Sequence, residues 1–331
     1  MLNKINNSIL KFDLNLKNKI VLTEAATGSY SSTPIIALLA GAKKVYALVK
    51  ETKYGTFEDV KKEFEKYLNN PNFKIIKSLK EITHKIDIVT NSGFVRPIDE
   101  KFINYLDSNS VVTLMYEPWE FRSSDIDLEL LHKNNIKVYG TNEHDKRLRT
   151  MDYIGLTVLY HLLDDKITAF SKNKLLILGN EEFTEPIERI LTHNDYLVHV
   201  VNNYDELVNI EDFDIFIVAE NKDTRYIIGH KDSYININFL NKEQKVIHIC
   251  GNVDFKNAHF SHKPEKPVSF GYMSYRTDFI DDMALIDLQT ASLKVAEGMI
   301  EANKLNLKNK DYKKFMESNY PSLSFDNNLY W

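Results

Sequence analysis

The chain has 331 residues, of which 43% are hydrophobic and 27% charged, and its formal net charge is −5. This composition is that of a folded protein of about two domains, and it excludes a disordered, collagen-like or disulfide-stapled chain. The acidic balance argues against nucleic acid as a partner, and no apolar stretch approaches the ~20 residues that span a bilayer. Because the N-terminus also has no signal-peptide pattern, we expect a cytoplasmic protein without a membrane partner.

Hydrophobic runs alternate with helical periods along the first 145 residues, a pattern typical of β-α-β units around a parallel sheet. The pattern predicts one complete doubly wound domain, which we place at residues 1–148. The expected strands are 19–24, 45–49, 73–76, 86–90, 111–115 and 137–139, and the expected helices are 33–40, 60–68, 99–106 and 127–133.

A second series of the same kind follows, and it predicts a second Rossmann-like domain at residues 168–276. It begins after a helix at 150–163. Its strands are expected at 174–178, 197–201, 215–219 and 246–249, with a helix at 186–191. A long helix at 281–304 is expected to complete the first domain, and residues 305–331 form a tail. The terminal Trp331 suits either a surface contact or a homodimer contact.

The loop after the first strand is the strongest candidate for a ligand site. A strand that feeds a Gly/Ser/Thr loop into a helix presents backbone N–H groups and the positive end of the helix dipole to an anion. Only one glycine of a G-x-G-x-x-G fingerprint is present, so a plain helix N-cap by Ser32 or Thr33 is the alternative. The residues that we assign to cofactor binding in this loop are Thr27, Gly28, Ser29, Tyr30 and Ser31.

The end of the second strand supplies polar groups at the place where dinucleotide folds bind the adenosine ribose. Glu51 can accept hydrogen bonds from ribose hydroxyls, while the cofactor residues Lys50, Thr52 and Lys53 can hold a 2′-phosphate. The spacing resembles NADP-binding domains of the shikimate-dehydrogenase kind, which implies NADP or NAD as cofactor. It equally resembles S-adenosylmethionine-dependent methyltransferases, with Glu24 before the loop, which implies S-adenosylmethionine instead.

The loop after strand 86–90 contains Asn91 and Arg96. Only seven of the 42 basic residues are arginine. Because lysine is the usual basic residue of this chain, an arginine in a loop is a stronger candidate for a specific role. A guanidinium can hold a carboxylate or phosphate through two parallel hydrogen bonds, although a surface pair with Asp99 or Asp87 is the alternative. We assign Asn91 to cofactor binding and Arg96 to substrate binding and catalysis.

The next two strand ends add further polar groups. Glu117 and Glu120 are candidate general acids or bases, provided that burial raises their pKa. Trp119 and Arg122 in the same loop, and Asn142 after the following strand, are candidate substrate-binding residues. Four consecutive strand ends with polar clusters point to the first domain as the one that carries the site, because such loops often hold functional residues.

The second domain also has a strand–loop–helix segment, at Gly179. Glu181 and Thr184 stand where a dinucleotide fingerprint has its second and third glycines, and a carboxylate would repel a pyrophosphate. We therefore do not expect this loop to bind NAD. The sequence has one cysteine and no Cys/His spacing that predicts a metal site, and we interpret its ten histidines as structural.

Taken whole, the chain resembles the formate/glycerate dehydrogenase superfamily, which includes the D-2-hydroxyacid dehydrogenases and S-adenosylhomocysteine hydrolases. The segments similar to that family are 125–142 and 213–218. The resemblance implies an α/β fold of two Rossmann-like doubly wound parallel-sheet domains, joined by crossing helices at 150–163 and 281–304. It does not extend to the catalytic set, because Cys250-Gly251-Asn252 and Tyr272–Arg276 stand where the dehydrogenases carry an arginine and a histidine.

Three functions remain open from the sequence. The first is an NAD(P)-dependent oxidoreductase-like enzyme of small-molecule metabolism that acts on a small anionic metabolite. The second is an S-adenosylmethionine-dependent methyltransferase that uses the same loop. The third is a non-catalytic two-domain binding or assembly protein, which the altered glycine loop of the second domain favours.

Overall fold

The computed structural model describes residues 1–52, 55–93, 95–207, 209–276 and 278–325. Lys53 and Trp331 lie outside the described residues. The chain divides into two compact units, and each is described by itself. Unit 1 comprises Met1–Leu148 and Asp282–Trp331, and unit 2 comprises Arg149–Asp281.

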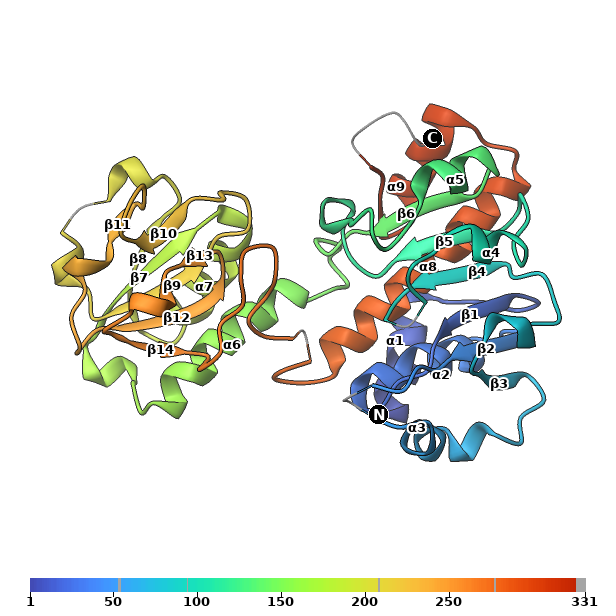
Figure 1. Ribbon diagram of the computed structural model, residues 1–331, viewed down its shortest axis with the longest axis horizontal. Coiled ribbons are helices and arrows are strands. Elements are labelled where there is room, and N and C mark those ends of the chain that lie inside the picture. The colour runs from blue at the N-terminus through green and yellow to red at the C-terminus, as the bar shows by residue number, and fades with distance from the viewer. Residues whose placement is uncertain (53–54, 94, 208, 277, 326–331) are drawn as a thin grey trace. The chain divides into compact units, whose positions relative to one another are not determined.

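The sheet of unit 1 has the strand order of dinucleotide-binding folds (Figure 1). Its order is β15-β6-β5-β4-β1-β2-β3, and only β15 runs antiparallel, against β6. The order reverses between β1 and β4, which makes their carboxyl ends the place where such sheets bind ligands. The strands are β1 (Ile20–Glu24), β2 (Lys44–Leu48), β3 (Phe73–Ile76), β4 (Ile88–Asn91), β5 (Val111–Leu114), β6 (Lys137–Thr141) and β15 (Ser322–Leu323).

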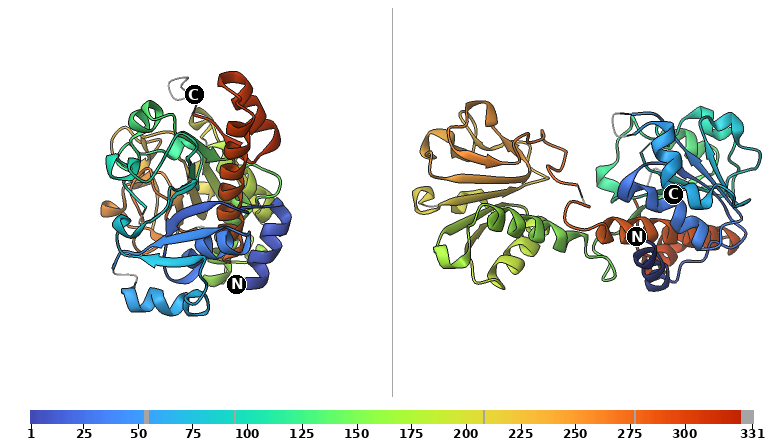
Figure 2. Two further views of the ribbon diagram at one scale, coloured as in Figure 1. Left: turned by 90° about the vertical axis from the view of Figure 1, so that its right-hand side faces the viewer. Right: turned by 90° about the horizontal axis from the view of Figure 1, so that it is seen from below.

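Helices cover both faces of this sheet, so its inner strands are buried on both sides and consist of nearly continuous apolar residues. One face carries α1 (Leu2–Phe12), α2 (Ser32–Leu39), α3 (Phe57–Glu63), α8 (Met283–Lys304) and α9 (Asn309–Asn319). The other face carries α4 (Glu100–Ile103) and α5 (Leu128–Lys133). Figure 2 shows α8, in orange-red, running beside α1, and α8 is buried along most of its length.

Unit 2 contains a five-stranded, all-parallel sheet in the order β14-β12-β9-β7-β8. Its strands are β7 (Lys174–Gly179), β8 (Leu197–Val201), β9 (Ile215–Ala219), β12 (Lys245–Cys250) and β14 (Ser261–Lys263). In chain order this is the 2-1-3-4-5 arrangement of the second common doubly wound type.

The two faces of the unit 2 sheet are covered differently. Helices α6 (Thr150–Asp164) and α7 (Glu181–Thr192) pack on one face. The opposite core is closed by 3₁₀ turns and by a small sheet of β10 (Tyr226–Gly229), β11 (Ile235–Asn236) and β13 (Asn252–Val253). Unit 2 therefore has the two-layer core of an α/β domain, but short segments replace helices on one side.

In unit 1, α1, α9 and β15 lie where the sequence analysis predicted no helix or strand, and in unit 2 the short strands β10, β11, β13 and β14 do. Helix α1 is rich in asparagine and lysine, but Ile5 and Phe12 are buried. Spacings of this kind place residues on one helix face, and tertiary packing then stabilises a helix that its composition alone does not favour. Within the described residues, no helix is both long and apolar enough to cross a membrane.

Candidate functional site

The carboxyl ends of β1 and β4 approach each other through Glu24 and Gly93. Glu24 is 4% exposed at the end of β1. A Cβ atom placed on Gly93 would lie 1.6 Å from Glu24 Oε2, and Gly93 has a φ of +36°. A side chain at position 93 would displace the end of the Glu24 side chain, and the positive φ also favours glycine at this position. The result is a buried carboxyl group at the point where the strand order reverses.

Gly28 forms an open corner beside this point. It has a φ of +65°, and a Cβ atom there would meet nothing within 4 Å. Its N–H donates a hydrogen bond of 3.2 Å to Oε1 of Glu63 on α3. This contact is exposed and joins an amide to a carboxylate, so it shows that the corner accepts an anionic oxygen.

The serine hydroxyls that follow Gly28 are turned into the protein. Ser31 Oγ donates to the carbonyl of Gly28 at 2.7 Å, and Ser32 Oγ donates to the carbonyl of Ser29 at 2.6 Å. Helix α2 has no side-chain N-cap bond, and the N-cap alternative is wrong for both Ser32 and Thr33, which are the first two residues of the helix. Of the predicted cofactor residues, Ser31 is buried, Gly28 is exposed, and Thr27, Ser29 and Tyr30 are half-buried.

The loops after β1, β2 and β4 are tied together. A Cβ atom on Gly55 would lie 3.1 Å from Cγ2 of Thr27, so the first two loops touch. Thr52 and Gly55 exchange two backbone hydrogen bonds of 3.2 Å. Lys50 Nζ donates to the carbonyl of Arg96 at 3.0 Å. The structure thus brings together the predicted residues Thr27, Lys50, Thr52 and Arg96, while Lys53 lies outside the described residues.

Arg96 is held in one orientation by its neighbours. Its Nε donates to Oδ1 of Asn91 at 2.8 Å, and its Nη2 donates to the Asn91 carbonyl at 3.0 Å. Its Nη1 lies 3.2 Å from Oδ2 of Asp125. The sequence analysis gave Asp99 or Asp87 as the alternative surface partner of Arg96. In the structure the carboxylate partner is Asp125 instead. Because a guanidinium has five N–H donors, these contacts leave two of them for a ligand.

Tyr116 and Asp125 belong to this cluster, although the sequence analysis did not assign them to the site. The Arg96 guanidinium lies 5.6 Å from the centre of the Tyr116 ring, and Asn91 Nδ2 donates to the Tyr116 hydroxyl at 2.5 Å. Burial raises the pKa of Tyr116 to about 12, so its hydroxyl stays protonated at neutral pH. Both residues could have been predicted from the sequence, because they lie in the loop after β5 beside residues that were assigned to the site.

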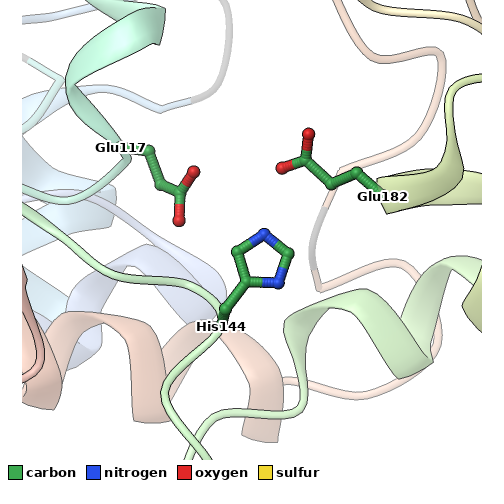
Figure 3. A group of neighbouring side chains, drawn as sticks. All are labelled: Glu117, His144 and Glu182. Carbon is green, nitrogen blue, oxygen red and sulfur yellow. The ribbon is translucent and has the colours of Figure 1, made fainter.

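Glu117 connects the loops after β5 and β6. Its side chain is 5% exposed and accepts hydrogen bonds from Trp119 Nε1 at 2.9 Å and from the Glu143 N–H at 3.0 Å. Figure 3 shows that the side chains of Glu117 and His144 approach each other, and a Glu117 oxygen lies within 4.8 Å of a His144 ring nitrogen. His144 is exposed and was interpreted as structural with the other histidines. The sequence could have indicated His144 as a site residue, because it follows the predicted substrate-binding residue Asn142 by two positions.

The remaining predicted residues lie around this connection. Trp119 is 55% exposed, Arg122 is exposed and Glu120 is half-buried. Asn142 uses its Oδ1 to accept from the His144 N–H at 3.0 Å, while its own N–H donates to the carbonyl of Pro321 at 2.9 Å. The side-chain oxygen of Asn142 therefore shapes its own loop.

At the corresponding edge of unit 2, a glycine packs against the neighbouring strand and a buried carboxyl group accepts backbone hydrogen bonds. A Cβ atom on Gly179 would lie 2.0 Å from the carbonyl oxygen of Ala219, so β7 and β9 meet there without space between them. Glu220 is 3% exposed and accepts from the N–H groups of Lys222 and Asp223 at 2.8 and 3.0 Å. Its other oxygen accepts from the Tyr204 hydroxyl at 3.0 Å. Glu220 thus accepts two backbone donors of the loop after β9, while the Asn221 N–H donates to Oδ1 of Asn180 at 3.2 Å.

Comparison with solved structures places the whole chain in a known architecture. A dipicolinate synthase polypeptide from Bacillus halodurans is 11% identical, with 89% of this chain and 100% of that chain covered at a TM-score of 0.55. A dipicolinate synthase polypeptide from Bacillus subtilis is 10% identical, with 88% and 99% covered at 0.54. The NAD-complexed D-isomer specific 2-hydroxyacid dehydrogenase from Lactobacillus delbrueckii ssp. bulgaricus is 10% identical, with 88% and 99% covered at 0.45.

At these identities the likeness shows the fold alone. The predicted α/β class with two mostly parallel sheets is confirmed, and so is the expectation of two Rossmann-like domains in one chain. No family model matches the sequence, and no curated protein matches it.

Proposed function

We propose that the chain is an NAD(P)-dependent oxidoreductase-like enzyme that acts on a small anionic metabolite, with its cofactor at the carboxyl edge of the unit 1 sheet. The open corner at Gly28 carries this proposal, because its amide already binds a carboxylate oxygen and its missing side chain leaves room for a larger anion. The strand order supports it, since the corner lies beside the reversal between β1 and β4.

The side chains around the corner have separable roles in this proposal. A phosphate at Gly28 displaces the exposed carboxylate of Glu63, and Lys50 and Thr52 lie on the adjoining loop toward the ribose. Arg96 offers its two remaining N–H donors to the anionic substrate, in an orientation fixed by Asn91 and Asp125. When bound, NAD(P) supplies the hydride acceptor or donor, and Glu117 and Glu120 are the candidate proton carriers.

Titration of the full chain with NADPH and NADH, followed by ligand fluorescence, tests the proposal. We expect saturable binding of at least one of them, and we expect Gly28→Asp to abolish it because a carboxylate would then fill the corner. Gly271→Asp is the matched control, because Gly271 also has a positive φ of +85° and nothing within 4 Å of its Cβ position, but lies in unit 2. Absence of binding at millimolar cofactor contradicts the proposal.

A second candidate, an S-adenosylmethionine-dependent methyltransferase, is favoured by Glu24. Its buried carboxylate repels a pyrophosphate that enters between β1 and β4, but it attracts the ammonium and sulfonium groups of S-adenosylmethionine. Calorimetry with this ligand distinguishes the two enzymes, and we expect Glu24→Gln to weaken S-adenosylmethionine while improving NADPH. If neither ligand binds, the third function, a non-catalytic binding or assembly protein, takes their place.

A further inference from the structure

The edge strands of the sheets in this protein differ in how well they are protected against pairing with a strand of another molecule. An edge strand exposes unpaired backbone N–H and C=O groups, and proteins usually blunt such edges with charges, prolines, bulges or short length. Edge strand β3 carries Lys74, whose ammonium donates to the carbonyl of Glu81 at 3.2 Å. Edge strand β14 has three residues, and its Lys263 lies 2.8 Å from a carboxylate oxygen of Asp165. Edge strands β15, β11 and β13 have two residues each.

Strand β8 has none of these devices. Its sequence is Leu197-Val198-His199-Val200-Val201, with no Lys, Arg, Asp, Glu or Pro. It pairs with β7 over all five residues without a register shift. Among the described residues, no backbone hydrogen bond of β8 reaches any segment other than β7. About half of its backbone groups therefore face away from β7, and within the part of the chain that the structure describes these groups have no backbone partner.

Apolar side chains accompany this free edge. Leu197 is 53% exposed, and Val198 and Val200 are only half-buried. Phe170 is 94% exposed. It lies four residues before Lys174, the residue of β7 that pairs with Leu197. A long, regular and apolar edge of this kind is a template for another strand.

We propose that β8 pairs with β8 of a second copy of this chain, antiparallel and across a two-fold axis at His199. In this register Leu197 faces Val201 and Val198 faces Val200, so apolar residues oppose apolar residues and no charged pair is created. An identical strand supplies the same row of donors and acceptors in reverse, which is the self-complementarity that a closed two-fold interface requires. Two five-stranded sheets then become one continuous sheet.

The absence of charged residues on β8 also favours a second copy of this chain as its partner. The other described edge strands longer than two residues, β3 and β14, carry Lys74 and Lys263, whereas β8 carries no lysine, arginine or carboxylate. The contact is small, since it involves five residues and their neighbours. Interfaces of this size are usually weak, so we expect a dimer that depends on concentration in the micromolar range.

Sedimentation velocity on the full chain, from low micromolar to several hundred micromolar, tests the proposal. We expect a monomer–dimer equilibrium. We expect His199→Lys to weaken it roughly fivefold or more, because two ammonium groups then oppose each other at the axis. His199→Gln, which is neutral and of similar size, retains the dimer. Leu10→Lys changes a residue on α1 that is 78% exposed, and it controls for the loss of any exposed apolar group.

Amide hydrogen exchange locates the contact. We expect residues 197–201 to exchange more slowly at high protein concentration in the wild type and in His199→Gln, but not in His199→Lys. A chain that is monomeric at all concentrations overturns the proposal. So does a dimer that His199→Lys leaves unchanged, or one in which concentration protects other segments and not 197–201.

Discussion

The two units of this chain have the same kind of sheet, yet the carboxyl edges of those sheets differ. In unit 1, the Gly28 corner is open and its amide contacts only an exposed carboxylate. In unit 2, Gly179 is packed against the Ala219 carbonyl, and the buried Glu220 accepts the donors of its own loop. A glycine in a strand–loop–helix segment therefore has two uses: it can leave room for a ligand, or it can let two strands close on each other.

The largest expected difference between the two units is in the loss of stability caused by Gly179→Ala and by Gly28→Ala. In Gly179→Ala the new Cβ atom would lie 2.0 Å from a backbone oxygen, so β7 and β9 must move apart, and we expect unit 2 to lose about 3 kcal/mol or more. Gly28→Ala meets no atom and pays only for its positive φ, about 1 kcal/mol. Denaturant unfolding of both variants measures the difference. Equal destabilisation would show that the two glycines have the same role.

His161 gives the stability of unit 2 a pH dependence in the mildly acidic range. Its ring is 6% exposed and lies against Tyr275 and Phe279, at centroid distances of 4.5 and 5.3 Å. Burial, aided by Lys263, lowers its pKa from 6.5 to about 4. Stability is complete above pH 6.5 and falls as the pH drops toward 4, because the unfolded chain binds the proton first. The loss reaches about 3 kcal/mol.

His161→Phe removes the titrating group and preserves an aromatic ring. We expect its unfolding free energy to change less than that of the wild type between pH 7 and pH 4.5, with the difference confined to the transition of unit 2. Denaturant melts at several pH values provide the measurement. Parallel curves for the two proteins would contradict the assignment.

Arg96→Lys sharpens the comparison at the unit 1 edge. A lysine cannot reproduce the contacts with both Asn91 and Asp125, so the buried Asn91 oxygen loses its donor and we expect a cost of about 1–2 kcal/mol. Arg122→Lys, at an exposed position of the neighbouring loop, is expected to change stability by no more than about 0.5 kcal/mol. Equal effects would mean that the Arg96 network is only a surface feature.

The sequence predicted the parallel strands well because buried strands are nearly continuous apolar runs. Strands Phe73–Ile76, Leu197–Val201 and Ile215–Ala219 have the predicted bounds. Helix α7 was predicted to begin at Pro186, but it begins at Glu181 and contains Pro186. In the structure α7 packs against α6 at Gly155, where a Cβ would lie 2.5 Å from the Pro186 carbonyl. Such packing between helices is not visible in a local pattern.

The candidate site was predicted as a set of strand ends, and the strand order explains why that worked. Parallel strands bring their carboxyl ends to one edge, so Thr27, Lys50 and Arg96 are joined by contacts although they are far apart in sequence. The partners of Arg96 could not be predicted in the same way. Spacing favoured Asp99, but the guanidinium turns to Asn91 and Asp125, which depends on how the loops after β4 and β5 pack.

Hydrogen exchange of the full chain with and without saturating NADPH tests the central claim most directly. We predict slower exchange at residues 25–33 and 91–96 of unit 1, and no change at residues 179–184 of unit 2. Protection confined to 179–184 would place the cofactor at the Gly179 loop of unit 2 and not at the Gly28 corner, and it would contradict the account.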